Sequence, residues 1–362
     1  MPQVPLPASG PLAPPPSVRA AVEAAPWRGG LEPCGDFSAS VTDTAGVLPA
    51  ALRGTLLRVG PSRIRVGPTK YAHWFDGDGG VLKISLGGAG GVTVAYKAVQ
   101  TERVVAQDAS PGATQAGSMP SRGAWTQATG GLLRNAFRLP TNPANVAPLV
   151  WGGKTAAACE GGAPVEVAPS DLATLGVLSQ WNRGGALGFG AHFKVDERTN
   201  VLYNLGMLPV GGLRVFALNR AGEELRAVTI PLPKLAFVHD FAQTVNFLVI
   251  IVPPWLSSPL GAVKSLLGLT ALGQTFTWDA DAPSRVVVLR KADLSVVLDT
   301  SLRPAISLYH FSAAWEEDGG GDDGVTRIVA QVSKHSAFRF CSFCHGLLRL
   351  TRDRSLHSRA AC

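Results

Sequence analysis

Short apolar runs recur in pairs along most of this chain, and this pattern limits the folds that are open to it. Each pair reads as two strands joined by a turn of polar or glycine residues, while helical periodicity is nearly absent. The expected pairs are 81–86 with 92–98, 191–195 with 201–206, 213–218 with 225–230, 239–244 with 247–252, 285–290 with 294–299, and 309–315 with 325–332. Serial hairpins at this spacing predict an all-β fold, either a β-propeller or a sandwich.

The composition indicates one large folded unit preceded by an N-terminal leader of different composition. Of the 362 residues, 46% are hydrophobic and only 16% are charged, which is enough to build a sizeable core. Residues 1–35 contain nine prolines and no periodicity. We therefore expect a leader there that is either disordered or an organelle transit segment. The first strand is expected at Thr55–Val59, closed by Gly60-Pro61.

Charge and cysteine content exclude several classes of function. The net charge is +7, but the basic residues form no long run and are not interleaved with aromatic residues, so nucleic-acid binding is not expected. Five cysteines, three of them in the last 22 residues, indicate a reducing compartment rather than a disulfide framework. The longest apolar run, 247–252, is too short to span a bilayer.

Three histidines lie in or beside the predicted strands: His192, His239 and His310. A single histidine on a strand is more often structural than metal-ligating. Together, three strand-borne imidazoles could converge on one ion, and imidazole suits iron, zinc and copper. Glu160, in a loop next to glycines, is a carboxylate that could orient one of these rings.

Several stretches resemble motifs of the carotenoid cleavage oxygenase family, which includes carotenoid and apocarotenoid dioxygenases, stilbene-cleaving dioxygenases and the retinoid isomerohydrolase. HWFDGDGGVL is similar to its early motif, with Gly80 where methionine is usual. AHFKVDERTNVLYNLG, VHDFAQTVNFLVI and YHFSAAWEEDG resemble, in the same order, the three motifs that carry metal-binding histidines. The resemblance runs from about residue 54 to 323.

The resemblance implies a fold and a chemistry. The family fold is a seven-bladed β-propeller with a cap of loops and short helices, here over residues 36–332 with the last blades missing. Four histidines bind Fe(II), and three glutamates orient three of them. Carried over, His192, His239 and His310 are metal ligands, and Glu160 is the partner of His239; His73 and Asp76 hold a turn. The implied reaction cleaves a conjugated double bond of a carotenoid or apocarotenoid with O2 and gives carbonyl products.

Two segments fall where the family places its apolar entrance. Ser121–Leu139 mixes apolar residues with three arginines and reads as a short helix or loop, whereas Trp255–Gly273 has apolar residues at helical spacing. The second segment fits equally a helix that covers the core and a patch that lies in a membrane interface. A hydrophobic isoprenoid would then enter from lipid. We expect a plastid or cytoplasmic protein that is peripherally associated with a membrane.

The C-terminal region departs from the family pattern. Residues 333–362 are basic, contain three cysteines and show no strand alternation, and no glutamate follows Glu317. His345-Gly346 only faintly resembles the last ligand motif, and the nearby C-S-F-C-H is a weak match to a haem or zinc motif. Two alternatives to carotenoid cleavage therefore remain open: a truncated, catalytically inactive homologue, and cleavage of a stilbene-like phenolic.

Overall fold

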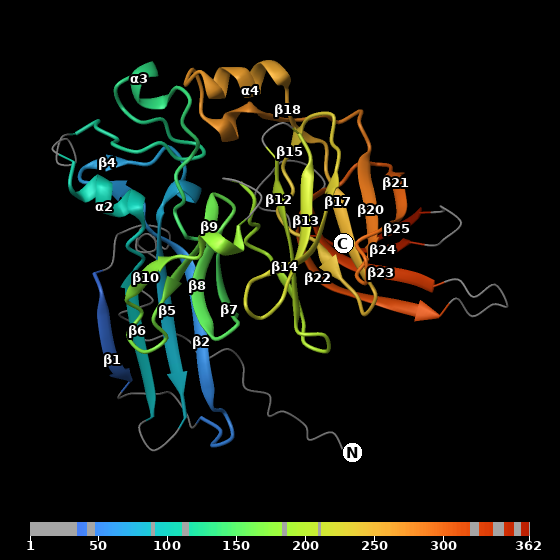
Figure 1. The fold of residues 1–362 in the computed structure, drawn as a ribbon, viewed down its shortest axis with the longest axis horizontal. Helices are drawn as coiled ribbons and strands as arrows, with labels where there is room; N and C mark the ends of the chain where they lie inside the picture. Colours follow the sequence, from blue (N-terminus) through green and yellow to red (C-terminus); the bar gives the residue numbers. More distant parts are fainter. Residues whose placement is uncertain are drawn as a thin grey trace.

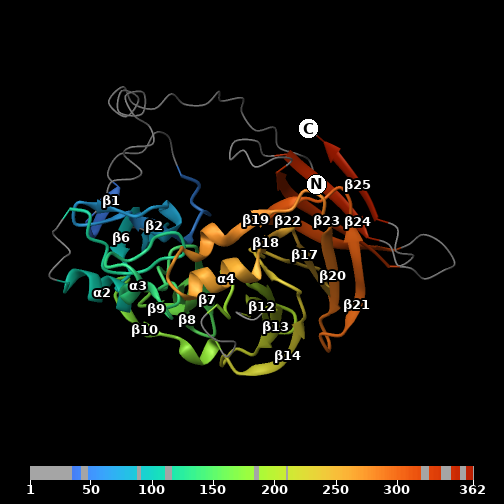
Figure 2. The same cartoon turned by 90° about the horizontal axis from the view of Figure 1, so that it is seen from above.

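The chain folds mostly into antiparallel β-sheets. The computed structural model describes residues 35–41, 48–87, 91–110, 116–182, 187–208, 211–318, 326–335, 344–350 and 356–361. These residues form five four-stranded sheets, one three-stranded sheet and one two-stranded sheet. Seen from above, the four-stranded sheets follow one another around an arc, each beside the next (Figure 2).

The four-stranded sheets are built from strands that are close in sequence. The first has the order β1-β6-β5-β2, and the other four follow chain order or its reverse. Their strands are β1 (Phe37–Val41), β2 (Gly54–Arg63), β5 (Asp78–Leu86), β6 (Val92–Ala98); β7 (Ala147–Trp151), β8 (Lys154–Cys159), β9 (Gly162–Val167), β10 (Thr174–Val177); β11 (Lys194–Asp196), β12 (Val201–Met207), β13 (Leu213–Leu218), β14 (Glu224–Ile230); β16 (Ala242–Gln243), β17 (Phe247–Val252), β20 (Ser284–Arg290), β21 (Val296–Leu302); and β22 (Ser307–Asp318), β23 (Thr326–His335), β24 (Cys344–Leu350), β25 (Leu356–Ala361).

Smaller elements connect and cover these sheets. The short strands are β3 (Arg65–Val66), β4 (Thr69–Lys70), β15 (Leu235–Ala236), β18 (Trp255–Ser257) and β19 (Phe276–Trp278). The helices are η2 (Trp74–Asp76), α2 (Glu102–Asp108), α3 (Leu132–Asn135), η3 (Ser179–Trp181), α4 (Pro259–Leu266) and η4 (Leu272–Thr275). Both α3 and α4 lie at the same end of the sheets (Figure 1). No helix of the described residues is long and apolar enough to cross a membrane.

All six predicted strand pairs form, each as an antiparallel hairpin. The sheets pack through both faces, as β17 shows. Leu248 and Ile250 belong to the core shared with the preceding sheet, whereas Val249 and Ile251 belong to the core shared with β22 and β23. Successive side chains of a strand point to opposite faces, so a strand between two sheets is apolar throughout.

Two expectations about the N-terminal strands were wrong. The expected first strand, Thr55–Val59, is the second, because β1 precedes it and pairs with β6. Gly60-Pro61 does not close that strand, because β2 runs through to Arg63 with an irregularity after Pro61. Proline has no N–H to donate, but β2 is an edge strand, where that loss is tolerated.

The C-terminal region also contains strands that sequence alternation did not indicate. β23 extends to His335, across the expected boundary at residue 333, and β24 and β25 pair beside it. The backbone of β23 offers a free row of hydrogen-bonding groups on its second side, and pairing satisfies them whatever the side-chain pattern is.

Candidate metal centre and cavity

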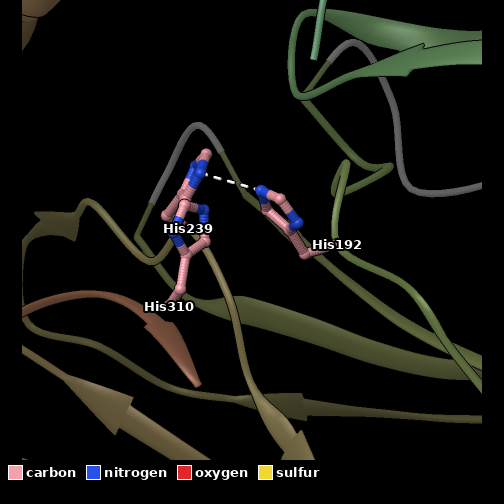
Figure 3. A group of neighbouring side chains, drawn as sticks. All are labelled: His192, His239 and His310. Carbon is pink, nitrogen blue, oxygen red and sulfur yellow. Dashed lines mark hydrogen bonds between the residues drawn. The ribbon is translucent and has the colours of Figure 1, made fainter. Parts of the chain in front are cut away.

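Three histidines from three neighbouring sheets meet at one point. His192 lies two residues before β11, His239 lies three residues before β16, and His310 lies in β22. One ring nitrogen of each lies within 4.8 Å of those of the other two. Figure 3 shows His192 pointing toward His239 with His310 beside it; the two Nε2 atoms of His192 and His239 are 2.9 Å apart.

Glu160 joins this group from a fourth sheet. It occupies the turn between β8 and β9, and its Oε1 lies 2.6 Å from Nδ1 of His239. Burial alone would lower the pKa of His239, but the charge and hydrogen bond of Glu160 outweigh it and raise that pKa. Burial would raise the pKa of Glu160, and the attraction of His239 overcomes this and lowers it. The pair therefore leaves Nε2 of His239 directed at the other rings.

The other two imidazoles are held neutral. Burial, followed by repulsion from His239, lowers the pKa of His192 to about 4. The same two causes, in the same order, lower the pKa of His310, although its side chain is exposed. A neutral imidazole is the form that binds a metal ion.

The donor set fits a divalent metal ion. Metal–imidazole bonds are roughly 2.0–2.1 Å long, so two ligands at a right angle place their nitrogens about 3 Å apart. The 2.9 Å between the Nε2 atoms of His192 and His239 matches this value. The neighbouring Cys159 does not extend the set, because burial and then the charge of Glu160 raise the pKa of its thiol to about 12.

Asp240 is a buried residue of this centre. The sequence places it directly after His239, but sequence reasoning gave it no partner and no role in the site. Its Oδ1 accepts from Nζ of Lys194 at 2.8 Å, and its Oδ2 accepts from the backbone N–H of Phe311 at 3.0 Å. Lys194 lies two residues after His192, and Phe311 follows His310. One carboxylate thus contacts both of the other histidine-bearing segments.

A second carboxylate, that of Glu316, links two of these segments at a point farther from the histidines. Glu316, in β22, accepts from the hydroxyl of Thr244 at 2.5 Å and from the backbone N–H of Asn246 at 2.7 Å. Both partners belong to the turn that follows the His239 segment. The polar residues of these two motifs therefore hold the sheets to one another.

A cavity of about 420 Å³ reaches the histidines. Its wall is mainly aromatic and aliphatic, and Glu160 also lines it. The aromatic part includes Phe75, Trp125, Phe237, Phe276 and Tyr309. Such a wall suits a long apolar molecule and supplies few polar partners of its own.

The early HWFDGDGG stretch shapes this wall. The N–H groups of Ala124 and Trp125 donate to the Asp76 carboxylate at 2.7 and 2.9 Å. The ring of His73 stacks on Trp125 with 5.1 Å between centroids, and its Nδ1 accepts from the N–H of Phe75. Both residues hold a turn, as expected, and also position Trp125.

His345 lies in β24. Its backbone pairs with Ser333, which in turn pairs with His310, so the three residues form one row across the sheet. Residues 1–34 and 336–343, which include all but the last residue of the expected leader and part of the C-S-F-C-H stretch, lie outside the described residues.

Comparison with known proteins identifies the family. The model of the retinal pigment epithelial membrane protein family matches residues 32–349. The chain belongs to this family, the carotenoid cleavage oxygenases. It is 30% identical over 293 residues to an apocarotenoid-15,15'-oxygenase of Synechocystis, covering 77% of this chain and 57% of the relative.

Other relatives have different substrates in their names. A carotenoid 9,10(9',10')-cleavage dioxygenase of Crocus sativus is 29% identical, over 81% of this chain and 56% of its own. An isoeugenol monooxygenase of Pseudomonas nitroreducens is 25% identical, over 75% and 54%. The chain thus spans little more than half the length of the family members that it matches.

The fold also matches solved structures of this family. A cobalt-substituted Synechocystis oxygenase superimposes with a TM-score of 0.78 at 24% identity, covering 92% of this chain and 71% of that one. A chimera of that oxygenase with the retinal pigment epithelial protein gives 0.77 at 23% identity. These matches establish the fold.

Proposed function

We propose that this protein is a non-haem Fe(II) dioxygenase that cleaves a conjugated double bond of a carotenoid or apocarotenoid. The observation that carries the proposal is the convergence of His192, His239 and His310 at an apolar cavity, with Glu160 on His239. Bound Fe(II) would supply the activation of O2. The carbon–carbon double bond breaks, each carbon gains one oxygen atom of O2, and no other reductant is needed.

The residues of the chain have separate tasks in this proposal. The three imidazoles would bind the ion in their neutral forms, His239 giving up its proton, so that they would not neutralise its charge. Glu160 keeps Nε2 of His239 directed at it. The aromatic wall would exclude water and align the polyene. Trp125, fixed by Asp76, gives that wall a defined shape.

We also propose that the five four-stranded sheets are successive blades of the seven-bladed propeller of this family. Their order around an arc and the superposition on solved family structures support this.

The test of the function is to load the protein with Fe(II) and measure both metal content and products. We expect about one iron per chain, lost in His239→Ala, and aldehydes from an apocarotenal in chromatographic analysis. Iron at wild-type stoichiometry in His239→Ala would contradict the assignment of the ligands. Iron without aldehydes would favour the inactive homologue.

A phenolic alkene is the second candidate substrate, because an isoeugenol monooxygenase is among the relatives. The same assay with isoeugenol and a stilbene in place of the apocarotenal separates the two. Cleavage of the phenolic compounds alone would replace the isoprenoid proposal.

We further propose that the substrate enters from a membrane on which the protein lies. Leu133 of α3 is 92% exposed, Phe137, two residues after α3, is 73% exposed, and Leu260 of α4 is 63% exposed. The two segments touch, because the N–H of Phe137 donates to the carbonyl of Leu266 at 2.6 Å. Contiguous exposed apolar side chains of this kind mark an interaction surface.

The two segments that contain these side chains, Ser121–Leu139 and Trp255–Gly273, also reach the cavity and carry positive charge. Trp125 and Leu272, from these segments, line the cavity. Arg134 and Arg138 line a neighbouring cleft, and among the described residues neither forms an ion pair. This charge would favour anionic headgroups.

A further inference from the structure

Asp240 occupies a singular position in the candidate metal centre. Its side chain is only 3% exposed, and it lies directly after His239 in the chain. A buried carboxylate is costly unless its oxygens are satisfied, so the partners that satisfy it are held firmly in return.

Those partners come from all three histidine-bearing segments. Oδ1 accepts from Nζ of Lys194 at 2.8 Å and from the N–H of Phe241 at 2.8 Å; Oδ2 accepts from the N–H of Phe311 at 3.0 Å. Lys194 is two residues from His192, Phe241 is two residues from His239, and Phe311 is adjacent to His310.

We propose that Asp240 is the positioning residue that sets the three imidazoles relative to one another. Glu160 orients one ring, His239, from outside the three segments. Asp240 instead fixes the spacing between segments whose members are 46 and 71 residues from it in sequence. The charge-assisted bond to Lys194 is the strong tie, and the N–H of Phe311 fixes the direction of the second oxygen. This inference rests on the proposed metal function.

The matched control is Asp196. It is a second buried aspartate that pairs with a lysine, Lys291, at 2.7 Å, and its side chain is 8% exposed. Its other partners lie in its own turn: the N–H groups of Arg198 and Thr199, and the guanidinium of Arg198 at 3.9 Å. Asp196→Asn therefore removes a similar buried charge without touching the residues beside the histidines.

The first measurement uses the metal-free full chain with ¹³C-labelled histidine rings. Signals of His192, His239 and His310 are assigned by single His→Gln variants. We expect Asp240→Asn to shift all three signals and Asp196→Asn to leave them in place. Lys194→Met, which breaks one tie, should move the His192 signal; because the charge of Lys194 also acts on His239 and His310, only the His192 signal is decisive in this variant. Unmoved signals in Asp240→Asn overturn the inference; if that variant does not fold, an unmoved His192 signal in Lys194→Met overturns it.

The second measurement is Co(II) affinity by competition with a chelator. We expect Asp240→Asn to bind about 10- to 100-fold more weakly than wild type, the usual effect of losing a group that orients metal ligands, while Asp196→Asn binds normally. Equal affinity of both variants means that Asp240 serves only stability. If the wild type takes up no Co(II), the proposed metal function fails, and the ring signals still decide the role of Asp240.

Discussion

Glu160 sets the orientation of a single ring, and its charge matters as much as its position. Glu160→Gln keeps the shape but removes the negative charge that raises the pKa of His239. We expect metal affinity to fall by about 10- to 100-fold, measured by chelator competition. The control is Glu166→Gln in β9, because Glu166 pairs with Lys154 at 2.8 Å, away from the histidines. Equal affinities in the two variants would remove Glu160 from the metal centre.

Cys159 stands beside Glu160 yet should take no part in metal binding. Its pKa, raised to about 12 by burial and then by Glu160, puts ionisation well above physiological pH. Because the thiolate is the reactive and ligating form, native Cys159 should resist iodoacetamide at pH 8 and react once the chain is unfolded in guanidinium. Mass spectrometry of its peptide measures this. Rapid alkylation of the native protein, or a loss of metal in Cys159→Ser, would contradict the prediction.

Sequence motifs indicated the residues whose chemistry is distinctive and missed those whose role depends on distant partners. The three histidines and Glu160 could be named because imidazole and carboxylate groups are what a metal centre needs. The partners of Asp240, and the contact of the turn residue Asp76 with Trp125, could not, because Phe311 and Trp125 are adjacent to these aspartates only in the fold. A buried aspartate next to a candidate ligand histidine was the available signal.

At the scale of elements, hairpins were predictable because their pairing is local. The two-residue period of a strand also differs clearly from the period of a helix. The strands of the C-terminal region were not, because β24 forms on the backbone edge of β23 rather than through its own alternation. Trp255–Gly273 left two interpretations open. The structure gives it a short helix, α4, with its outer apolar side chains exposed.

The exposed apolar side chains of α3 and α4 lead to a prediction about membrane binding. Leu133 is 92% exposed, so Leu133→Asp should leave the fold intact while it removes apolar area and adds a charge that anionic lipids repel. We expect reduced flotation with anionic liposomes. Leu175→Asp in β10, at a position 61% exposed, should float like wild type. Unchanged flotation of Leu133→Asp would place the membrane contact elsewhere.

At the scale of the whole molecule, four sheets contribute to one centre: His192, His239 and His310 come from three, and Glu160 comes from a fourth. No local pattern encodes such a meeting point. The meeting point depends on how successive sheets stack through their shared apolar cores. The hairpin pattern predicts the class of fold but not this stacking.

A metal ion bound between sheets should stabilise the whole molecule, because it binds the folded state and finds no preformed site in the unfolded chain. At a free concentration of about 100 times Kd, the gain is about 2.7 kcal/mol, and Tm should rise by a few degrees over protein treated with EDTA. His310→Ala, which leaves two imidazoles, should lose most of this rise. Mg²⁺, which prefers oxygen ligands, is the control and should give none. Calorimetry of the two proteins with Co(II), Mg²⁺ and EDTA decides the matter: an equal rise in His310→Ala and wild type would show that the ion stabilises the fold from a different site.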